Sequence, residues 1–196
     1  MADSSSLSRQ PYFDLATFPV TETIAMVTCL LEKITKANDK LHPSKHSITC
    51  FHARSVPSID IQSYLNRILK YCPCANECFL SLLVYFDRIT QQNKKLFTID
   101  SYNIHRLIIS GIMVSSKFFS DVFFTNTRYA KVGGLPVEEL NLLELEFLKM
   151  NNFNIHVSVE ELQQYGNQLL MHSIREENRL KQRELNMYIN NNEPYV

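Results

Sequence analysis

Two oppositely charged residues, Lys117 and Glu144, stand where the surrounding pattern favours apolar or small side chains. Lys117 closes the segment 102–119, whose middle is apolar on every helical face, as in a helix at the buried centre of a domain. Glu144 lies in the segment 136–150, inside the apolar arc that about 100° per residue gives for a helix. Because an unpaired buried charge is very costly, we expect this carboxylate to have a partner or to face another protein. The two charges predict a polar anchor within an apolar surface.

Each charge also has a simpler explanation. A lysine in the last turn of a helix is stabilised by the helix dipole, by roughly 0.3–1 kcal/mol. Glu144 could bind an internal partner, with Lys117 as one candidate, and such a pair would still offer spare donors and acceptors to a protein. Leu142 and Leu145 lie outside the main apolar arc of the same segment. Either they face a partner or they are buried against the last helix of the chain.

The cysteines Cys72, Cys74 and Cys78 form the cluster that most suggests metal or thiol chemistry. Their spacing differs from the Cys-x-x-Cys half-site of structural zinc, and no second pair follows. We therefore expect Cys74 and Cys78 to be small buried residues at the start of a helix, and we predict no metal site. His105 and His156 are interpreted as packing or hydrogen-bonding residues.

The composition indicates an intracellular domain that binds other proteins. The 196 residues include 20 basic and 20 acidic side chains, so the formal net charge is zero, unlike that of a typical nucleic-acid or membrane-surface binder. The apolar runs are too short to span a bilayer, and the N-terminus shows no basic-then-apolar leader pattern. An odd number of cysteines, five, fits reduced thiols in the cytoplasm or nucleus. We expect no cofactor, no small-molecule substrate, and no nucleic-acid or membrane partner.

Apolar residues recur at three- and four-residue spacing along most of the chain, and no useful length alternates with period two. The pattern predicts an all-α protein with five helices between Ser58 and Met150, one flanking helix before them and one after. The first three expected helices are 20–38, a helix that is capped by Ser58 or Asp60 and ends before Pro73, and 75–91. The central apolar helix is 102–119, with Thr98 or Asp100 as its cap. After it we expect a short helix that ends at Gly133-Gly134, a helix over 136–150, and a last helix that begins at Ser158.

These elements divide the chain into four parts. Residues 1–18 are Ser-rich and aperiodic, which predicts a flexible N-terminal arm. An N-terminal helix and loop occupy 19–57, and the five-helix domain occupies 58–156. The part 157–196 is opened by the capping-box pattern Ser158-x-x-Glu161, and its apolar stripe thins beyond Arg175, so we expect a helix with a frayed tail.

Six runs in a fixed order lie between residues 51 and 157, within a stretch from about Phe51 to Leu170 that resembles a known family. They are Phe51-His-Ala-Arg-Ser-Val-Pro-Ser-Ile; Tyr64-Leu-Asn-Arg-Ile-Leu-Lys-Tyr; Tyr85-Phe-Asp-Arg-Ile; Asn103-Ile-His-Arg-Leu-Ile-Ile with Ser116-Lys-Phe-Phe-Ser-Asp and Asn126-Thr-Arg-Tyr-Ala-Lys-Val-Gly-Gly-Leu; Leu140-Asn-Leu-Leu-Glu-Leu-Glu-Phe-Leu; and Phe153-Asn-Ile-His-Val. Together they resemble the cyclin box of the P/U-type cyclins, the class related to the fungal phosphate-pathway cyclins. The resemblance implies a single five-helix cyclin box over 58–156.

The resemblance also implies roles for individual residues. Lys117 and Glu144 match the lysine and glutamate that cyclins use together to bind the kinase, and Arg67 and Asp87 match the pair through which the first two box helices hold each other. Ser120 departs from the family, which often has an acidic residue there. Only one box is expected, and the Met-Arg-Ala-Ile-Leu docking stretch of cell-cycle cyclins is missing, so we do not expect a substrate-docking groove of that kind.

The function that the resemblance implies is regulation of a cyclin-dependent protein kinase. Such a subunit packs on the kinase N-lobe and pushes its mobile helix inward, so that the kinase's own glutamate meets its ATP-orienting lysine. The cyclin supplies no catalytic residue and no cofactor, and is not an enzyme. Two alternatives remain: a cyclin-fold transcription or nucleic-acid-binding module, which the neutral charge disfavours, and a thiol or metal enzyme, which rests only on the cysteine cluster.

Overall fold

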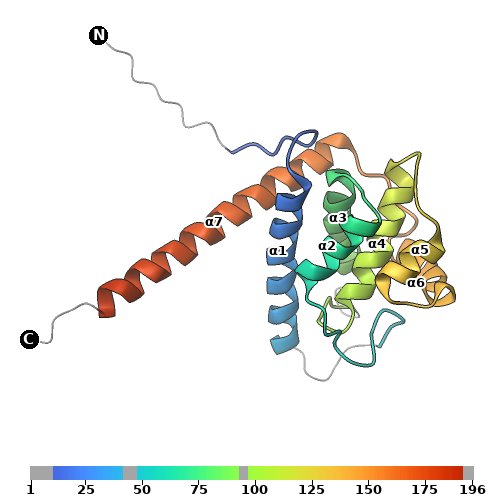
Figure 1. The fold of residues 1–196 in the computed structure, drawn as a ribbon, viewed down its shortest axis with the longest axis horizontal. Coiled ribbons are helices and arrows are strands. Elements are labelled where there is room, and N and C mark those ends of the chain that lie inside the picture. Colours follow the sequence, from blue (N-terminus) through green and yellow to red (C-terminus); the bar gives the residue numbers. More distant parts are fainter. Residues whose placement is uncertain (1–10, 42–47, 93–96, 192–196) are drawn as a thin grey trace, which may run out of the picture.

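The computed structural model describes residues 11–41, 48–92 and 97–191, and over these ranges its regular structure is entirely helical. Its helices are α1 (Val20–Leu41), α2 (Ile61–Tyr71), α3 (Asn76–Gln92), α4 (Ile104–Phe119), α5 (Asn126–Gly133), α6 (Val137–Met150) and α7 (Val159–Asn191). The five helices predicted between Ser58 and Met150 are present as α2 to α6, and α1 and α7 precede and follow them (Figure 1). The all-α prediction is confirmed, and apart from the end of α7 the predicted helix ends differ from the observed ones by only a few residues.

Helix α4 lies at the centre of the domain because it is apolar on all sides. From Ile104 to Ser116 every residue except Arg106 is buried, and α2, α3, α5 and α6 all pack against the helix. Two of its buried hydroxyls bond within the helix: Ser110 Oγ donates to the Arg106 carbonyl and Ser115 Oγ to the Gly111 carbonyl, at 2.8 and 2.7 Å. Apart from Arg106, only the last turn, which carries Lys117, reaches the surface.

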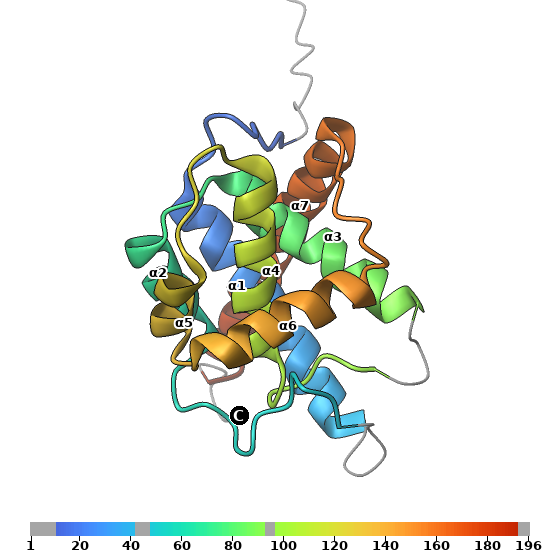
Figure 2. The ribbon, with the colours of Figure 1, turned by 90° about the vertical axis from the view of Figure 1, so that its right-hand side faces the viewer.

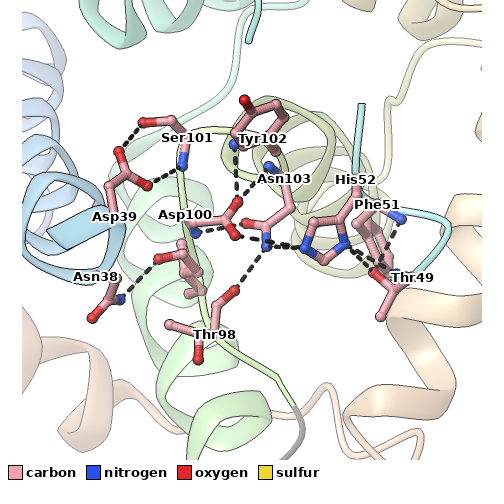
Figure 3. A network of polar contacts seen from close by, with 11 residues as sticks. Asn38, Asp39, Thr49, Phe51, His52, Thr98, Asp100, Ser101, Tyr102 and Asn103 are labelled. Carbon is pink, nitrogen blue, oxygen red and sulfur yellow. Dashed lines mark hydrogen bonds and ion pairs between the residues drawn. The ribbon is translucent and has the colours of Figure 1, made fainter. Parts of the chain in front are cut away.

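A network of polar contacts fixes the chain where it enters α4 (Figure 3). Asp100 Oδ1 accepts hydrogen bonds from the backbone N–H groups of Tyr102 and Asn103, at 2.9 and 3.1 Å. Asn103 in turn accepts from the Asp100 N–H and donates from Nδ2 to the Thr98 carbonyl. The ring of His52 faces the same carboxylate, with Nε2 3.6 Å from Asp100 Oδ2. Asp100, one of the two predicted caps, therefore caps the turn that leads into the helix.

Three other predicted helix ends have the expected chemistry. Asp60 Oδ1 accepts from the Ser63 N–H at 2.7 Å and caps α2. Gly134 ends α5 in the left-handed region, with φ of 72°, which glycine adopts without strain. Ser158 Oγ accepts from the Glu161 N–H at 3.2 Å at the start of α7. The Glu161 side chain does not complete the capping box, because it binds an arginine of α3.

Residues 11–18 pack on the protein, which corrects the predicted flexible arm for this part of it; residues 1–10 lie outside the described residues. Phe13 is fully buried, and its ring stacks on Phe18 with centroids 4.3 Å apart. Its N–H donates to Asn167 Oδ1 at 2.9 Å, and its carbonyl accepts from Gln163 Nε2 at 2.5 Å. Gly166 of α7 makes room for the ring, because a Cβ there would come within 2.6 Å of it. The sequence did not predict this docking, because the few apolar residues of 11–18 show no periodicity.

Helix α7 continues to Asn191, which corrects the fraying predicted beyond Arg175. Its first half packs on α1 and α3, whereas residues 177–188 are exposed and extend away from the body of the molecule (Figure 1). Glu176 binds Lys33 of α1 at 2.5 Å and Arg179 of its own helix at 3.1 Å. The exposed part consists largely of strong helix formers, which favour the helix without an apolar stripe.

Candidate functional site

The structure brings Lys117 and Glu144 together. Lys117 Nζ lies 2.6 Å from Glu144 Oε1, and the two side chains are 27% and 19% exposed. Lys117 is in the last turn of α4, and Glu144 is on α6. Helix α6 packs on α4 and crosses in front of it in Figure 2. The structure therefore agrees with the simpler explanation of each charge, since Lys117 ends a helix and Glu144 has Lys117 as an internal partner.

Asn126, the first residue of α5, holds the second oxygen of the same carboxylate. Its Nδ2 donates to Glu144 Oε2 at 3.0 Å and to Asn141 Oδ1 at 2.7 Å. We call Lys117, Glu144 and Asn126 the anchor cluster. The ammonium group has three protons and the carboxylate about four lone-pair directions, so hydrogen-bonding capacity remains for a partner. Sequence reasoning missed Asn126, because no local pattern links it to a residue 18 positions away.

Large apolar side chains are exposed on the elements that carry the anchor cluster. Leu142 and Leu145 of α6 are 66% and 45% exposed, so they are not buried against the last helix. Phe118, next to Lys117, is 41% exposed, and Phe123 in the loop between α4 and α5 is 53% exposed. Groups of exposed apolar side chains mark surfaces that bind proteins. The last turn of α4, the following loop and α6 thus combine a hydrogen-bonded charge pair with exposed apolar side chains.

The structure does not bring Arg67 and Asp87 together, so the pair that the resemblance implies is not formed. Arg67 Nη2 instead donates to the Lys131 carbonyl at 3.2 Å, and Asp87 Oδ2 accepts from the Tyr165 hydroxyl at 2.7 Å. The reason is the packing of the two helices: α2 contacts α1, α4 and α5, whereas α3 contacts α1, α4 and α7. Their charged side chains therefore meet different neighbours.

The neighbouring residue Arg88 provides a strong polar link between α3 and α7. Its Nη2 binds both carboxylate oxygens of Glu161, at 2.9 and 3.1 Å, and its Nη1 donates to the carbonyls of Asn154 and His156. Charge-assisted hydrogen bonds of this kind are stronger than neutral ones. The local sequence pattern did not predict these contacts, because the partners of Arg88 are more than 60 residues away from it.

Two thiols of the cysteine cluster, Cys72 and Cys74, lack the lowered pKa of a reactive thiol. Burial raises the pKa of the Cys72 thiol. The pKa of Cys74 is raised by its hydrogen bond with Cys78 and by burial. Thiols of this kind stay protonated near neutral pH, whereas nucleophilic attack needs the thiolate. Within the described residues no three His, Cys, Asp or Glu side chains are placed to share a metal ion.

The two histidines have structural contacts. His105 Nε2 is 2.8 Å from the Ile59 carbonyl, and its ring packs edge-on against Tyr64 with centroids 5.0 Å apart. Burial lowers the pKa of His105. The ring of His156 packs edge-on against Phe118 near the end of α4, with centroids 6.2 Å apart.

Comparison with known proteins identifies the class. Residues 21–155 match the family model for cyclins, and the chain belongs to the cyclin family. It is 46% identical over 174 residues to PHO85 cyclin-like protein psl1 of Schizosaccharomyces pombe, covering 82% of this chain and 72% of that protein. It is 44% identical over 178 residues to PHO85 cyclin-7 of Saccharomyces cerevisiae, covering 80% of this chain but only 62% of that protein. With Cyclin-U4-1 of Arabidopsis thaliana the identity is 40% over 149 residues, covering 74% of this chain and 73% of the plant protein.

These relatives confirm the resemblance to the P/U-type cyclins. Two of them bear PHO85 cyclin names and one is named Cyclin-U, so both the P-type and the U-type groups are represented. In the described part of the chain, no helix has the length and apolar character needed to cross a membrane.

Proposed function

We propose that this cyclin binds and activates a cyclin-dependent protein kinase, with Lys117 and Glu144 as the polar anchor of the interface. The observation that carries the proposal is the 2.6 Å pair between these side chains on the surface of a cyclin-family domain. Exposed Phe118, Leu142 and Leu145 lie on the same two helices and supply apolar contact area. Two fungal relatives bear the name PHO85 cyclin, and we take the partner of this chain to be a kinase of that class.

The cyclin acts in this proposal by shifting a conformational equilibrium. A rigid helical domain that packs on the kinase N-lobe stabilises the inward position of the mobile helix, in which the kinase's glutamate meets its ATP-orienting lysine. The unused protons of Lys117 donate to backbone carbonyls of the kinase, and the free lone pairs of Glu144 accept from its N–H groups. The cyclin supplies no catalytic group and no cofactor, and acts in the cytoplasm or nucleus.

Most of the binding free energy comes from the apolar residues. Each Leu or Phe side chain that goes from fully exposed to fully buried contributes about 1.5–3 kcal/mol, and the partly exposed ones contribute less. A partly exposed ion pair adds little to the stability of the free protein. The anchor cluster therefore contributes mainly specificity, because a partner that leaves it unpaired while covering it incurs the desolvation penalty of both charges.

The test is affinity capture from native lysate with the wild type and the swapped variant Lys117→Glu/Glu144→Lys. The swap can keep the internal ion pair but reverses the charge presented at each position. A matched control, Arg106→Glu/Glu139→Arg, swaps a second ion pair between α4 and α6, in which Arg106 Nη2 lies 2.6 Å from Glu139 Oε1. Circular dichroism checks that all three proteins are equally helical.

We expect the wild type and the control to recover a protein kinase together with its activity, and the anchor swap to recover neither. Identification of the captured kinase by mass spectrometry names the partner. Equal recovery by the wild type and the anchor swap would show that Lys117 and Glu144 do not anchor the interface. Recovery of no kinase by the wild type would contradict the proposed function itself.

A further inference from the structure

A hollow of about 1100 Å³ between α2 and α5 is lined by four cations and by no acidic side chain. Arg67 and Lys70 come from α2, and Arg128 and Lys131 come from α5, each pair spaced three residues apart so that both side chains lie on one face of their helix. We call this hollow the basic pocket. It lies in a chain whose formal net charge is zero, so a basic composition does not explain it.

Among the described residues, the four cations of the basic pocket lack counter-ions, as do exposed cations such as Lys40 and Lys181, but in the pocket four of them line one hollow. Elsewhere in the described ranges, carboxylates lie within 4.0 Å of several lysines and arginines: Lys33, Lys36, Arg88, Arg106, Lys117, Lys149 and Arg179. No described carboxylate lies that close to any of the four pocket cations. The Asp60 carboxylate contacts the lining through Ser63, which it binds as the cap of α2. The pocket therefore carries a concentrated positive charge.

Both arginines of the pocket are held in place by backbone carbonyls. Arg128 Nε donates to the Tyr71 carbonyl at 2.7 Å, and its guanidinium lies 4.2 Å from the centre of the Phe124 ring. Arg67 Nη2 donates to the Lys131 carbonyl at 3.2 Å. Each of these contacts uses one of the five N–H groups of its guanidinium, so the others can bind a ligand. An arginine that is positioned in advance loses less entropy when it binds an oxyanion.

Hydroxyl groups complete the lining. Thr125 and Thr127 lie among the cations, as does Ser63, whose hydroxyl donates to Asp60 Oδ2 at 2.9 Å and is not free to donate to a ligand. Thr125 Oγ1 accepts a hydrogen bond from the Arg128 N–H, which leaves its proton free to donate. Cations together with hydroxyl donors match a group with several acceptor oxygens and more than one negative charge. A phosphate ester is such a group, since near neutral pH it carries about −1.5 to −2 charges and three acceptor oxygens.

We propose that the basic pocket binds a phosphoserine or phosphothreonine in a segment of another protein. The pocket is local and the chain as a whole is neutral, whereas a nucleic-acid duplex needs an extended basic face. The inference rests on the proposed function, because a kinase subunit meets proteins that the kinase has already phosphorylated. A segment held in this pocket would raise the effective concentration of its remaining acceptor sites near the kinase.

The test uses the purified full chain and two immobilised degenerate peptide pools, one with a fixed central phosphothreonine and the other with threonine. The informative variant is Lys70→Ala/Lys131→Ala, which removes two pocket charges and leaves the arginine–carbonyl contacts in place. The matched control, Lys40→Ala/Lys181→Ala, removes the same charge from exposed lysines of α1 and α7. Inorganic tripolyphosphate and duplex DNA serve as further probes.

We expect the wild type and the control to retain the phosphorylated pool selectively, and the pocket variant to bind it about ten-fold or more weakly, because charge-assisted contacts are lost. Equal retention of both pools, or equal binding by the pocket variant and the control, would overturn the proposal. So would binding of tripolyphosphate or DNA without binding of phosphopeptides.

A kinase-capture experiment in parallel separates this proposal from the proposed function. The pocket variant should still recover kinase at the wild-type level, and the anchor swap should still bind phosphopeptides. Pocket-dependent phosphopeptide binding by a chain that recovers no kinase would refute the proposed function and leave the phosphate site standing. Kinase recovery without phosphopeptide binding would refute the phosphate site alone.

Discussion

Replacement of Phe13 by alanine tests whether residues 11–18 are part of the folded protein. The Phe13 ring is fully buried and packs against Phe18 and Gly166. A Phe→Ala change in a core costs about 3–5 kcal/mol, because apolar contacts are lost and a cavity is left. At about 2–4 °C per kcal/mol for a chain of this size, the melting temperature should fall by about 6–20 °C. If residues 11–18 simply detach from α7 in the variant, the loss of stability cannot exceed the free energy with which they dock. The melting temperature then falls by an amount at the lower end of this range.

The matched control is Tyr12→Ala, one residue earlier. The Tyr12 side chain is 64% exposed and makes a single hydrogen bond, from its hydroxyl to Gln163 Oε1 at 3.2 Å. Its loss should cost no more than about 1 kcal/mol. Urea unfolding followed by circular dichroism measures both variants, and hydrogen exchange should show faster exchange in α7 around Gly166 for Phe13→Ala. If the two variants are equally stable, residues 11–18 do not contribute to the fold and the docking described here is wrong.

Three further predictions concern a turn, a histidine and the anchor cluster. Gly134→Ala should destabilise the protein by about 1–2 kcal/mol in urea unfolding, because its φ of 72° is strained for alanine; an unchanged midpoint would contradict this. Burial lowers the pKa of His105 below 6.5, and its Nδ1 is buried without a partner, so the unfolded chain takes up the proton first as the pH falls. Stability should therefore be complete above about pH 6.5 and decline below it. His105→Gln should flatten this decline without abolishing it, since the pKa of His172 is also lowered; the same slope in both proteins would refute the assignment. Asn126→Ala should weaken kinase binding several-fold in calorimetry with unchanged helicity, because Glu144 loses a donor; unchanged affinity would remove Asn126 from the anchor cluster.

The helices of this protein were predictable because their signals are local. Apolar residues at three- and four-residue spacing, Asp60 as a cap and Gly134 as a stop each act within a turn or two of the chain. The Lys117–Glu144 pair was also predictable, although 27 residues separate its members. Each charge violates the apolar pattern of its own helix, and two such violations of opposite sign on neighbouring helices favour a pair.

The rest of the structure depends on contacts between distant segments. The docking of Phe13 on α7 joins residues about 150 positions apart, and the Arg88–Glu161 pair spans 73. The periodicity of apolar residues within a helix does not predict contacts over such separations. The absence of an Arg67–Asp87 contact has the same origin, because the neighbours of α2 and α3 are set by the packing of the whole domain. The basic pocket was missed because its four cations come from two helices, each with only two of them.

The most direct test of the kinase-binding account is the phosphotransfer rate of a purified cyclin-dependent kinase of the PHO85 class, measured with and without this chain. We predict that the wild type activates the kinase, that Leu142→Asp/Leu145→Asp and the Lys117→Glu/Glu144→Lys swap do not, and that the Arg106→Glu/Glu139→Arg control does. The leucines are 66% and 45% exposed, so their replacement should leave the helical content unchanged. A kinase that is equally active with the wild type and with both altered surfaces would contradict the assignment of α4 and α6 as the kinase-binding face.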